Sequence, residues 1–197
     1  MEFIPGELYH IYNQGNNRET IFRKQDNYIY FLKKVKIHVQ ENCEILAYCL
    51  MPNHFHFLVM ANKRSQENFR VGSLIVNQLS NGFRLLLSSY SKAINKQENR
   101  SGSLFRQKTK YKCLTLSSPY NDYPIVCFHY IHQNPLKAGL VEKMEDWEFS
   151  SFREYIDKEK EGLCDQNIAA RFLDIDKQSF YSDSYSLIEP MELKNIF

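Results

Sequence analysis

The sequence lacks the signatures of several large protein classes. Its five cysteines form no C-x-x-C pair, and it contains no Walker loop, no Gly-rich dinucleotide fingerprint and no nucleophile elbow. No apolar run is long enough to cross a membrane, and the first residues do not combine a basic region with an apolar stretch. These absences argue against zinc knuckles, disulfide frameworks, P-loop enzymes and α/β-hydrolases. They predict a cytoplasmic protein with reduced thiols, no signal peptide and no membrane partner.

What is present is an ordinary globular composition with an uneven charge distribution. Of the 197 residues, 43% are hydrophobic and 24% are charged, which suits one domain with a real core. The net charge is only +2, but residues 84–112 hold eight basic residues against Glu98 alone. Residues 142–197 are instead acidic. A basic run is most often a solvated face, so it indicates nucleic-acid binding only together with other signals.

Hydrophobic periodicity divides the chain into strands and helices. Alternating apolar residues predict strands, apolar residues at helical spacing predict helices, and Gly, Asn and Pro mark the turns. The pattern predicts strands at 7–14, 43–50, 54–61 and 104–116, a helix from Gln25 to about Asn42, a long helix capped by Ser73, and a helix from Tyr123 that ends before Pro135. The order βαββαβα indicates an α+β fold of the ferredoxin-like, split βαβ type, with an antiparallel sheet and helices packed on one face.

One predicted strand carries a histidine pair. His54 and His56 are separated by Phe55, and because side chains alternate along a strand, both imidazoles point to the same face. Such a pair can share a metal ion, or it can merely decorate a half-exposed strand. The apolar Phe55, Phe57 and Val59 indicate a packed central strand, in which unpartnered polar rings are costly. This favours a ligand pair.

The last predicted helix carries a second candidate group. Tyr130 and Asn134 lie one turn apart on the same helix face. An asparagine oxygen and two imidazoles suit Mg²⁺ or Mn²⁺, so His54, His56 and Asn134 form a plausible three-ligand set. Taken alone, Asn134 is better explained as a helix C-cap before proline than as a ligand. For Tyr130 the structural explanation is stronger still, because most of the thirteen tyrosines must be structural. Nearby His129 and Gln133, and His10 from the first strand, are candidates for supporting contacts.

Several segments together resemble a known family. YHIYNQGNNRETIF, LAYCLMPNHFHFLV, YSKAINKQENRSGSLFRQKTKYK, YIHQNPLKAGLV and DWEFSSFREY are similar, in the same order, to segments of the REP-associated tyrosine transposases. These belong to the single-tyrosine HUH superfamily of bacterial insertion-sequence transposases. The resemblance covers roughly residues 7–156, and the pairing of M-P-N-H-F-H with Y-I-H-Q-N-P makes it specific.

The resemblance implies a site and an activity. In it, His54 and His56 are the metal ligands, Tyr130 is the nucleophile and Asn134, often glutamine in relatives, holds the third ligand position. The expected activity is cleavage and rejoining of single-stranded DNA near hairpins, such as repetitive palindromic elements, through a 5′-phosphotyrosine with Mg²⁺ or Mn²⁺. The expected organisation is an HUH transposase domain at 1–156, an acidic tail of uncertain order at 157–197, and a monomer or homodimer.

Basic and polar residues outside the catalytic set are expected to contact the DNA. Lysine and arginine side chains would bind phosphates, and Tyr90, Phe105 and Tyr111 could stack on unpaired bases. The expected DNA-contacting residues are Asn16, Arg18, Lys92, Lys96, Arg100, Arg106, Lys108, Lys110 and Lys112.

Three alternatives remain open at this stage. The chain could be a DNA-binding regulator that no longer cuts, or an RNA-binding module, because small βαββαβ domains hold RNA on sheet aromatics and basic loops. It could also be a nickase of the same HUH chemistry that serves replication or conjugation, although such enzymes usually have larger architectures. The two binding modules predict binding without a covalent product, and a mere binder would need no histidine pair with a tyrosine.

Overall fold

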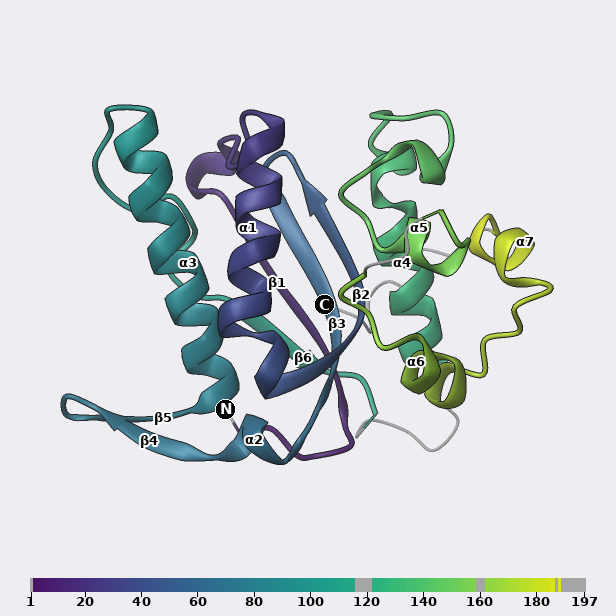
Figure 1. Cartoon of the computed structure of the whole chain (residues 1–197), viewed down its shortest axis with the longest axis horizontal. Helices are drawn as coiled ribbons and strands as arrows, with labels where there is room; N and C mark the ends of the chain where they lie inside the picture. The colour runs from purple at the N-terminus through teal and green to yellow at the C-terminus, as the bar shows by residue number, and fades with distance from the viewer. Residues whose placement is uncertain (1, 116–121, 159–161, 187, 189–197) are drawn as a thin grey trace.

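A four-stranded antiparallel sheet forms the centre of the described structure (Figure 1). The computed structural model describes residues 2–115, 122–158, 162–186 and 188. The strand order β2-β3-β1-β6 places β1 and β3 in the middle, as the ferredoxin-like arrangement requires. The predicted α+β class with an antiparallel sheet is therefore confirmed. The strands are β1 (Leu8–Gln14), β2 (Cys43–Met51), β3 (His54–Ala61) and β6 (Lys110–Cys113).

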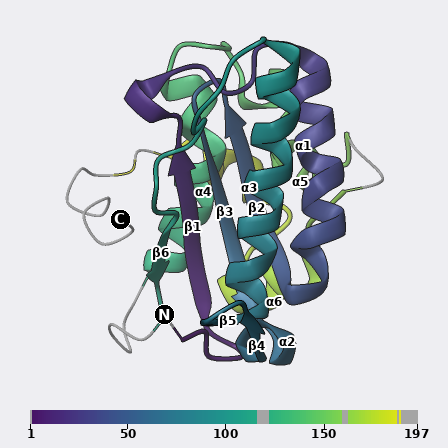
Figure 2. The ribbon, with the colours of Figure 1, turned by 90° about the vertical axis from the view of Figure 1, so that its left-hand side faces the viewer.

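Helices cover both faces of this sheet, whereas the sequence predicted helices on one face. Figure 2 shows α1 (Gln25–His38) and α3 (Gln78–Gln97) on one side and α4 (Tyr123–Lys137) on the other. Each side has its own apolar core. One core joins β-strand residues to α1 and α3, and the other joins Leu8, Leu46 and Leu58 to α4. The buried strands have apolar residues on both faces, so each face needs a cover.

Strand β3 shows how one sequence serves both cores. Phe55, Phe57 and Val59 are fully buried in the core under α1 and α3. The intervening His56 and Leu58 point to the face that α4 covers, because side chains alternate along a strand. The period of two predicted from the sequence therefore sets which residues pack and which line the site.

Gly82 lets α1 and α3 approach closely. A Cβ atom at this position would collide with the carbonyl oxygen of His38 in α1. In the middle of a helix, glycine is normally destabilising relative to alanine. The structure gives the reason for a glycine there: the backbone of the neighbouring helix fills the space that a side chain would need.

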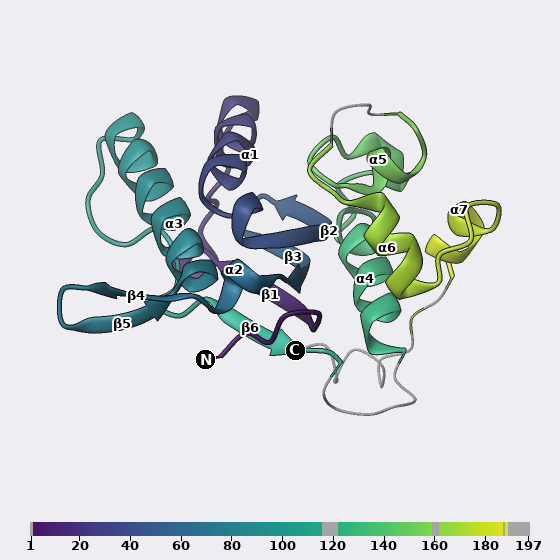
Figure 3. The same ribbon diagram turned by 60° about the horizontal axis from the view of Figure 1, so that its bottom comes forward.

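A β-hairpin replaces the predicted start of the long helix. The sequence suggested that Ser73 caps it, but Leu74–Asn77 is strand β5, which pairs with β4 (Asn68–Val71) across a turn at Gly72 with φ of +61°. Asn77 is the actual N-cap, and its side-chain oxygen accepts a hydrogen bond from the Ser80 backbone N–H. The hairpin projects beside the end of α3 (Figure 3).

Helix α4 runs past the proline that was expected to end it. Pro135 lies inside the helix, which continues to Lys137, and the Ala138 N–H still bonds to the Asn134 carbonyl. A proline this close to a helix end removes a single backbone hydrogen bond, so the last turn tolerates it.

The segment after residue 146 is more ordered than the sequence suggested. Trp147 donates its indole N–H to the Leu50 carbonyl, and Ser150 bridges to Cys49, so this segment covers the outer edge of β2. The supposedly irregular tail contains α6 and α7, whose apolar residues join the core under α4. The shorter helices are α2 (Lys63–Gln66), α5 (Phe152–Tyr155), α6 (Gln166–Leu173) and α7 (Phe180–Ser184), with 3₁₀ turns at Asn16–Arg18, Gln40–Asn42 and Met144–Asp146.

Within the described ranges, no helix combines the length and apolar character needed to cross a membrane.

Candidate active site

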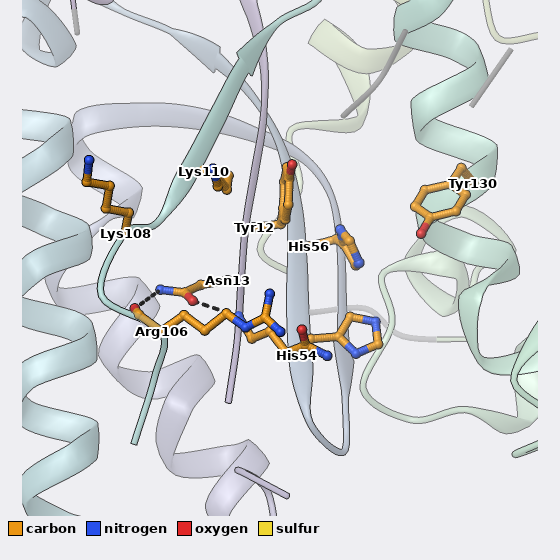
Figure 4. A pocket seen from close by; sticks show the side chains of 9 residues that line it. Tyr12, Asn13, His54, His56, Arg106, Lys108, Lys110 and Tyr130 are labelled. Atoms are coloured by element: carbon orange, nitrogen blue, oxygen red, sulfur yellow. Dashed lines mark hydrogen bonds between the residues drawn. The ribbon is translucent and has the colours of Figure 1, made fainter. Parts of the chain in front are cut away.

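The histidine pair lies on the central strand β3, facing α4. His56 pairs across the sheet with Tyr12 of β1, and His54 pairs with Gln14. The two imidazole rings are 5.0 Å apart between centroids and nearly perpendicular. Both point toward α4 in Figure 4. The expectation that the two rings share one side of the sheet is confirmed.

Hydrogen bonds set the protonation of the His54 ring. Its Nδ1 lies 2.6 Å from the Asn53 Oδ1, while the Asn53 amide donates to the Arg18 carbonyl. The Asn53 oxygen can only accept, so His54 Nδ1 carries the proton and Nε2 carries the lone pair. Burial lowers the pKa of His54, and a hydrogen bond with Asn134 partly offsets this. A neutral ring with its lone pair on Nε2 is the form that binds a metal.

His56 is held by His10, the residue expected from β1. His10 is fully buried, and its Nε2 lies 2.8 Å from the His56 Nδ1. When His56 donates through Nδ1, its own lone pair is on Nε2. Burial, together with the neighbouring His10 and His54, lowers the pKa of His56 well below its usual value, so this ring also stays neutral.

Tyr130 faces this pair from α4. Its ring centroid is 5.6 Å from that of His56 and 6.4 Å from that of His10, and its hydroxyl is directed toward the histidines in Figure 4. Burial raises the pKa of Tyr130 to about 12, although a hydrogen bond with Asn134 acts in the opposite direction. The phenol is therefore fully protonated at neutral pH without an added positive charge.

Asn134 connects the tyrosine and the histidines. It lies one turn after Tyr130, is 9% exposed, and donates from its amide nitrogen to the Tyr130 carbonyl at 2.8 Å. Its side chain also interacts with the His54 ring and the Tyr130 phenol. Among the described residues, no group of three or more His, Cys, Asp or Glu side chains is placed to hold a metal ion. The Asn134 amide is thus the neutral polar group that lies beside both the His54 ring and the Tyr130 phenol.

A cavity of about 360 Å³ opens between these groups and a basic rim. The histidine pair and Tyr130 line one side, and Arg106, Lys108 and Lys110 line the other (Figure 4). Among the described residues, no Asp or Glu lines it. Such a cavity suits a phosphodiester, because the rim is positive and the floor holds neutral imidazole rings.

The remaining predicted DNA-contacting residues lie in other places. Lys112 pairs with His10 across the sheet, on the same face. Arg100 is in an ion pair with Glu19 at 3.2 Å, and Asn16 donates to the Ser103 carbonyl. Three further residues are exposed and do not line the cavity: Arg18, Lys92 and Lys96.

Four residues do not lie where their expected roles require. His129 and Gln133 lie on the side of α4 that contacts α7: the His129 ring is 3.2 Å from the Ser184 hydroxyl, and Gln133 donates to the Ser184 carbonyl. They do not support the histidine pair. Tyr90 and Phe105 are 0% and 4% exposed, so neither can stack on a base. Both are core residues under α1 and α3, and the sequence pattern could not distinguish burial from exposure for them.

A split βαβ sheet with an H-x-H pair opposite a helical tyrosine defines the architecture of the single-tyrosine HUH proteins. Residues 6–134 match the model of the family described as "Transposase IS200 like", and the chain belongs to that family.

Individual relatives agree with this assignment. A Haemophilus influenzae protein described as a REP-associated tyrosine transposase is 26% identical over 111 residues. The match covers 55% of this chain and 58% of that protein, so the chain spans less than two thirds of its relative. A solved structure of a REP-associated tyrosine transposase bound to a REP hairpin is similar in fold, with a TM-score of 0.58 and 18% identity. The similarity covers 84% of this chain and 92% of that one. The resemblance stated from the sequence is confirmed.

Proposed function

We propose that this protein cleaves and rejoins single-stranded DNA next to a hairpin through a covalent bond to Tyr130. The observation that carries the proposal is the position of the Tyr130 phenol, 5.6 Å between ring centroids from His56, across a cavity with a basic rim. The relative solved with a REP hairpin supports a DNA hairpin of repetitive palindromic type as the substrate class.

In the proposed reaction the Tyr130 oxygen attacks the scissile phosphorus in line. The Tyr130 hydroxyl loses its proton as its oxygen bonds to the 5′ phosphate, and the P–O3′ bond breaks. The departing 3′ oxygen takes up a proton and becomes a 3′-hydroxyl, so the step consumes and releases no net proton. Attack by a different 3′-hydroxyl on the phosphotyrosine reverses these steps and joins two strands. The covalent bond conserves the phosphodiester energy, so rejoining needs no ATP.

The residues present fit a divalent metal such as Mg²⁺ or Mn²⁺. The donors would be Nε2 of His54, Nε2 of His56 and the amide oxygen of Asn134. When bound, the ion would supply positive charge for the phosphate oxygens and for the developing phenolate. Asn53 and His10 contact the two rings at their Nδ1 atoms and orient them, and burial favours the neutral form of both. Arg106, Lys108 and Lys110 would orient the phosphate backbone.

The structure supports cutting over the two binding alternatives. An RNA-binding module of this topology presents aromatics on an open sheet face, but Phe55 and Phe57 are fully buried under α1 and α3, and α4 covers the other face. A regulator that only binds would have no need of neutral imidazoles beside a phenol.

The proposal is tested by incubating labelled single-stranded hairpin oligonucleotides with Mg²⁺ or Mn²⁺ and looking for a protein–DNA adduct on a denaturing gel. Wild-type protein should form the adduct, and Tyr130→Phe should abolish it, because phenylalanine has no oxygen to attack phosphorus. The matched control is Tyr123→Phe, the same change at the start of the same helix and outside the cavity lining. An adduct that persists in Tyr130→Phe would move the chemistry to another residue.

A further inference from the structure

A second cavity adjoins the candidate active site. It has a volume of about 410 Å³ and lies between α3 and the segment 103–111. Asn13 and Arg106 line both cavities, so the two hollows lie on either side of these residues. We call the second cavity the side groove. Its polar lining on the helix side consists of Ser80, Arg84, Ser88 and Ser91.

The side groove is positive, and none of the described residues that line it is acidic. Arg84 bonds to the neutral Asn81 amide oxygen through Nε at 3.0 Å and Nη2 at 2.7 Å. Arg100, by contrast, is neutralised by Glu19. In the described part of the chain, no ion pair involves Arg84 or Arg106. Both guanidinium groups therefore keep their full charge for an anion, and a guanidinium binds phosphate oxygens well.

The remaining lining suits a nucleotide base better than a second phosphate. Hydroxyl groups of Ser80, Ser88 and Ser91 can each donate and accept, as base edges require, and Leu87 adds an apolar surface. The volume is in the range of small-molecule sites, which an unstacked nucleotide fills. A duplex is too wide to enter it.

Hydrogen bonds hold the segment between the two cavities in place against β1. Asn13 donates from its side chain to the Arg106 carbonyl at 3.2 Å and to the Thr109 hydroxyl at 3.1 Å. The Arg106 N–H bonds to the Gln14 carbonyl at 2.8 Å. These bonds fasten the segment to β1, so a ligand would not have to order it.

We infer that the side groove binds an unpaired nucleotide next to the scissile phosphodiester, with Arg84 on its phosphate and the serine hydroxyls at its base. A strand whose scissile phosphate lies between His56 and Tyr130 would reach the groove by passing Arg106. This inference rests on the proposed function, because it defines the groove by its place beside the bond that is cut. On this inference, the unpaired strand and the hairpin stem bind to different parts of the protein.

The test compares two labelled oligonucleotides, a hairpin with an unpaired flank that spans the cleavage position and the same hairpin without the flank. Binding is measured by fluorescence anisotropy at one salt concentration for wild type, Arg84→Gln and Lys96→Gln. Lys96 is the matched control, since it is an exposed cation on the same helix but does not line the groove. Ser91→Leu fills the groove without changing the charge and serves as a second variant.

Arg84→Gln should weaken binding of the flanked hairpin about tenfold more than Lys96→Gln does, as expected for one lost charge-assisted hydrogen bond. The two variants should affect the bare hairpin equally, because each loses one positive charge. Ser91→Leu should weaken binding of the flanked hairpin and leave binding of the bare hairpin unchanged.

Equal effects of Arg84→Gln and Lys96→Gln on both oligonucleotides, or an inert Ser91→Leu, would overturn the inference. Adduct formation by the wild type with the flanked hairpin is scored separately. If the wild type forms the adduct but the variants do not distinguish the two oligonucleotides, the groove inference is wrong and the proposed function stands. If the variants weaken binding of the flanked hairpin selectively but the wild type forms no adduct, the proposed cleavage is wrong and the groove inference stands.

Discussion

The two faces of strand β3 differ in what they contact. Phe55 and Phe57 point into a core of aromatic rings that α1 and α3 close completely. His54 and His56, one residue away in each case, point to a face where a single helix leaves a cavity beside Tyr130. Stability and chemistry are thus separated by one step along the chain, because a strand alternates its side chains.

If the faces are truly separate, a change on the packed face should cost stability and spare the chemistry. Phe55→Ala should reduce the free energy of unfolding by about 3–5 kcal/mol, since it empties a fully buried site. Urea unfolding measures the loss, and adduct formation by the folded protein should persist. His54→Ala, on the other face, is the control and should lose the adduct while changing stability much less. Similar unfolding midpoints for the two variants would break the comparison.

A change on the chemical face should weaken metal binding while keeping the fold. His10→Phe removes the partner of His56 Nδ1 and should lower Mn²⁺ affinity about 10- to 100-fold, the usual cost of losing a group that orients a ligand. Titration calorimetry with Mn²⁺ gives the affinity. His10→Gln keeps a polar group there and should recover part of it. Wild-type affinity in His10→Phe would show that β1 plays no part in holding the ligands.

The smallest expected effect concerns the helices behind the packed face. Gly82→Ala normally stabilises a helix, but here the methyl group would collide with the His38 carbonyl and push α1 and α3 apart. We expect a loss of about 1–3 kcal/mol in unfolding free energy, as for other overpacked sites. The control, Lys92→Ala on the exposed side of α3, should stay within about 0.5 kcal/mol of wild type. A stabilised Gly82→Ala protein would mean that the helices have room to separate.

The sequence predicted the parts of this fold that depend on periodicity. Alternation in HFHFLVMA placed both histidines on one face, and helical spacing placed Tyr130 and Asn134 on one side of their helix. The face that receives that helix was predicted wrongly, because local patterns do not say on which side of a sheet a connection passes. The pairing of His10 with His56 is a contact between residues 46 positions apart, and only the fold shows it.

Local signals misled where two readings compete. Leu74, Ile75 and Val76 fit either a helix start or a strand, and the turn at Gly72 decides for the strand. Pro135 marked a helix end correctly to within one turn. Sequence alone also could not show that Phe105 is buried while its neighbour Arg106 faces the cavity, since that depends on how the segment lies against β1.

The contact between α4 and α7 affects how precisely the Tyr130 side chain is oriented. Gln133 donates two hydrogen bonds, at 2.8 and 2.9 Å, to the carbonyls of Ser184 and Ser186, on the side of α4 away from the sheet. These bonds resist rotation of α4 about its own axis, and a misplacement of about 1 Å at a reacting atom can slow a reaction about a hundredfold. Residues some fifty positions after Tyr130, beyond the residues 6–134 that match the family model, therefore help to fix the orientation of its side chain. Family members with different C-terminal segments should differ in how tightly that orientation is held.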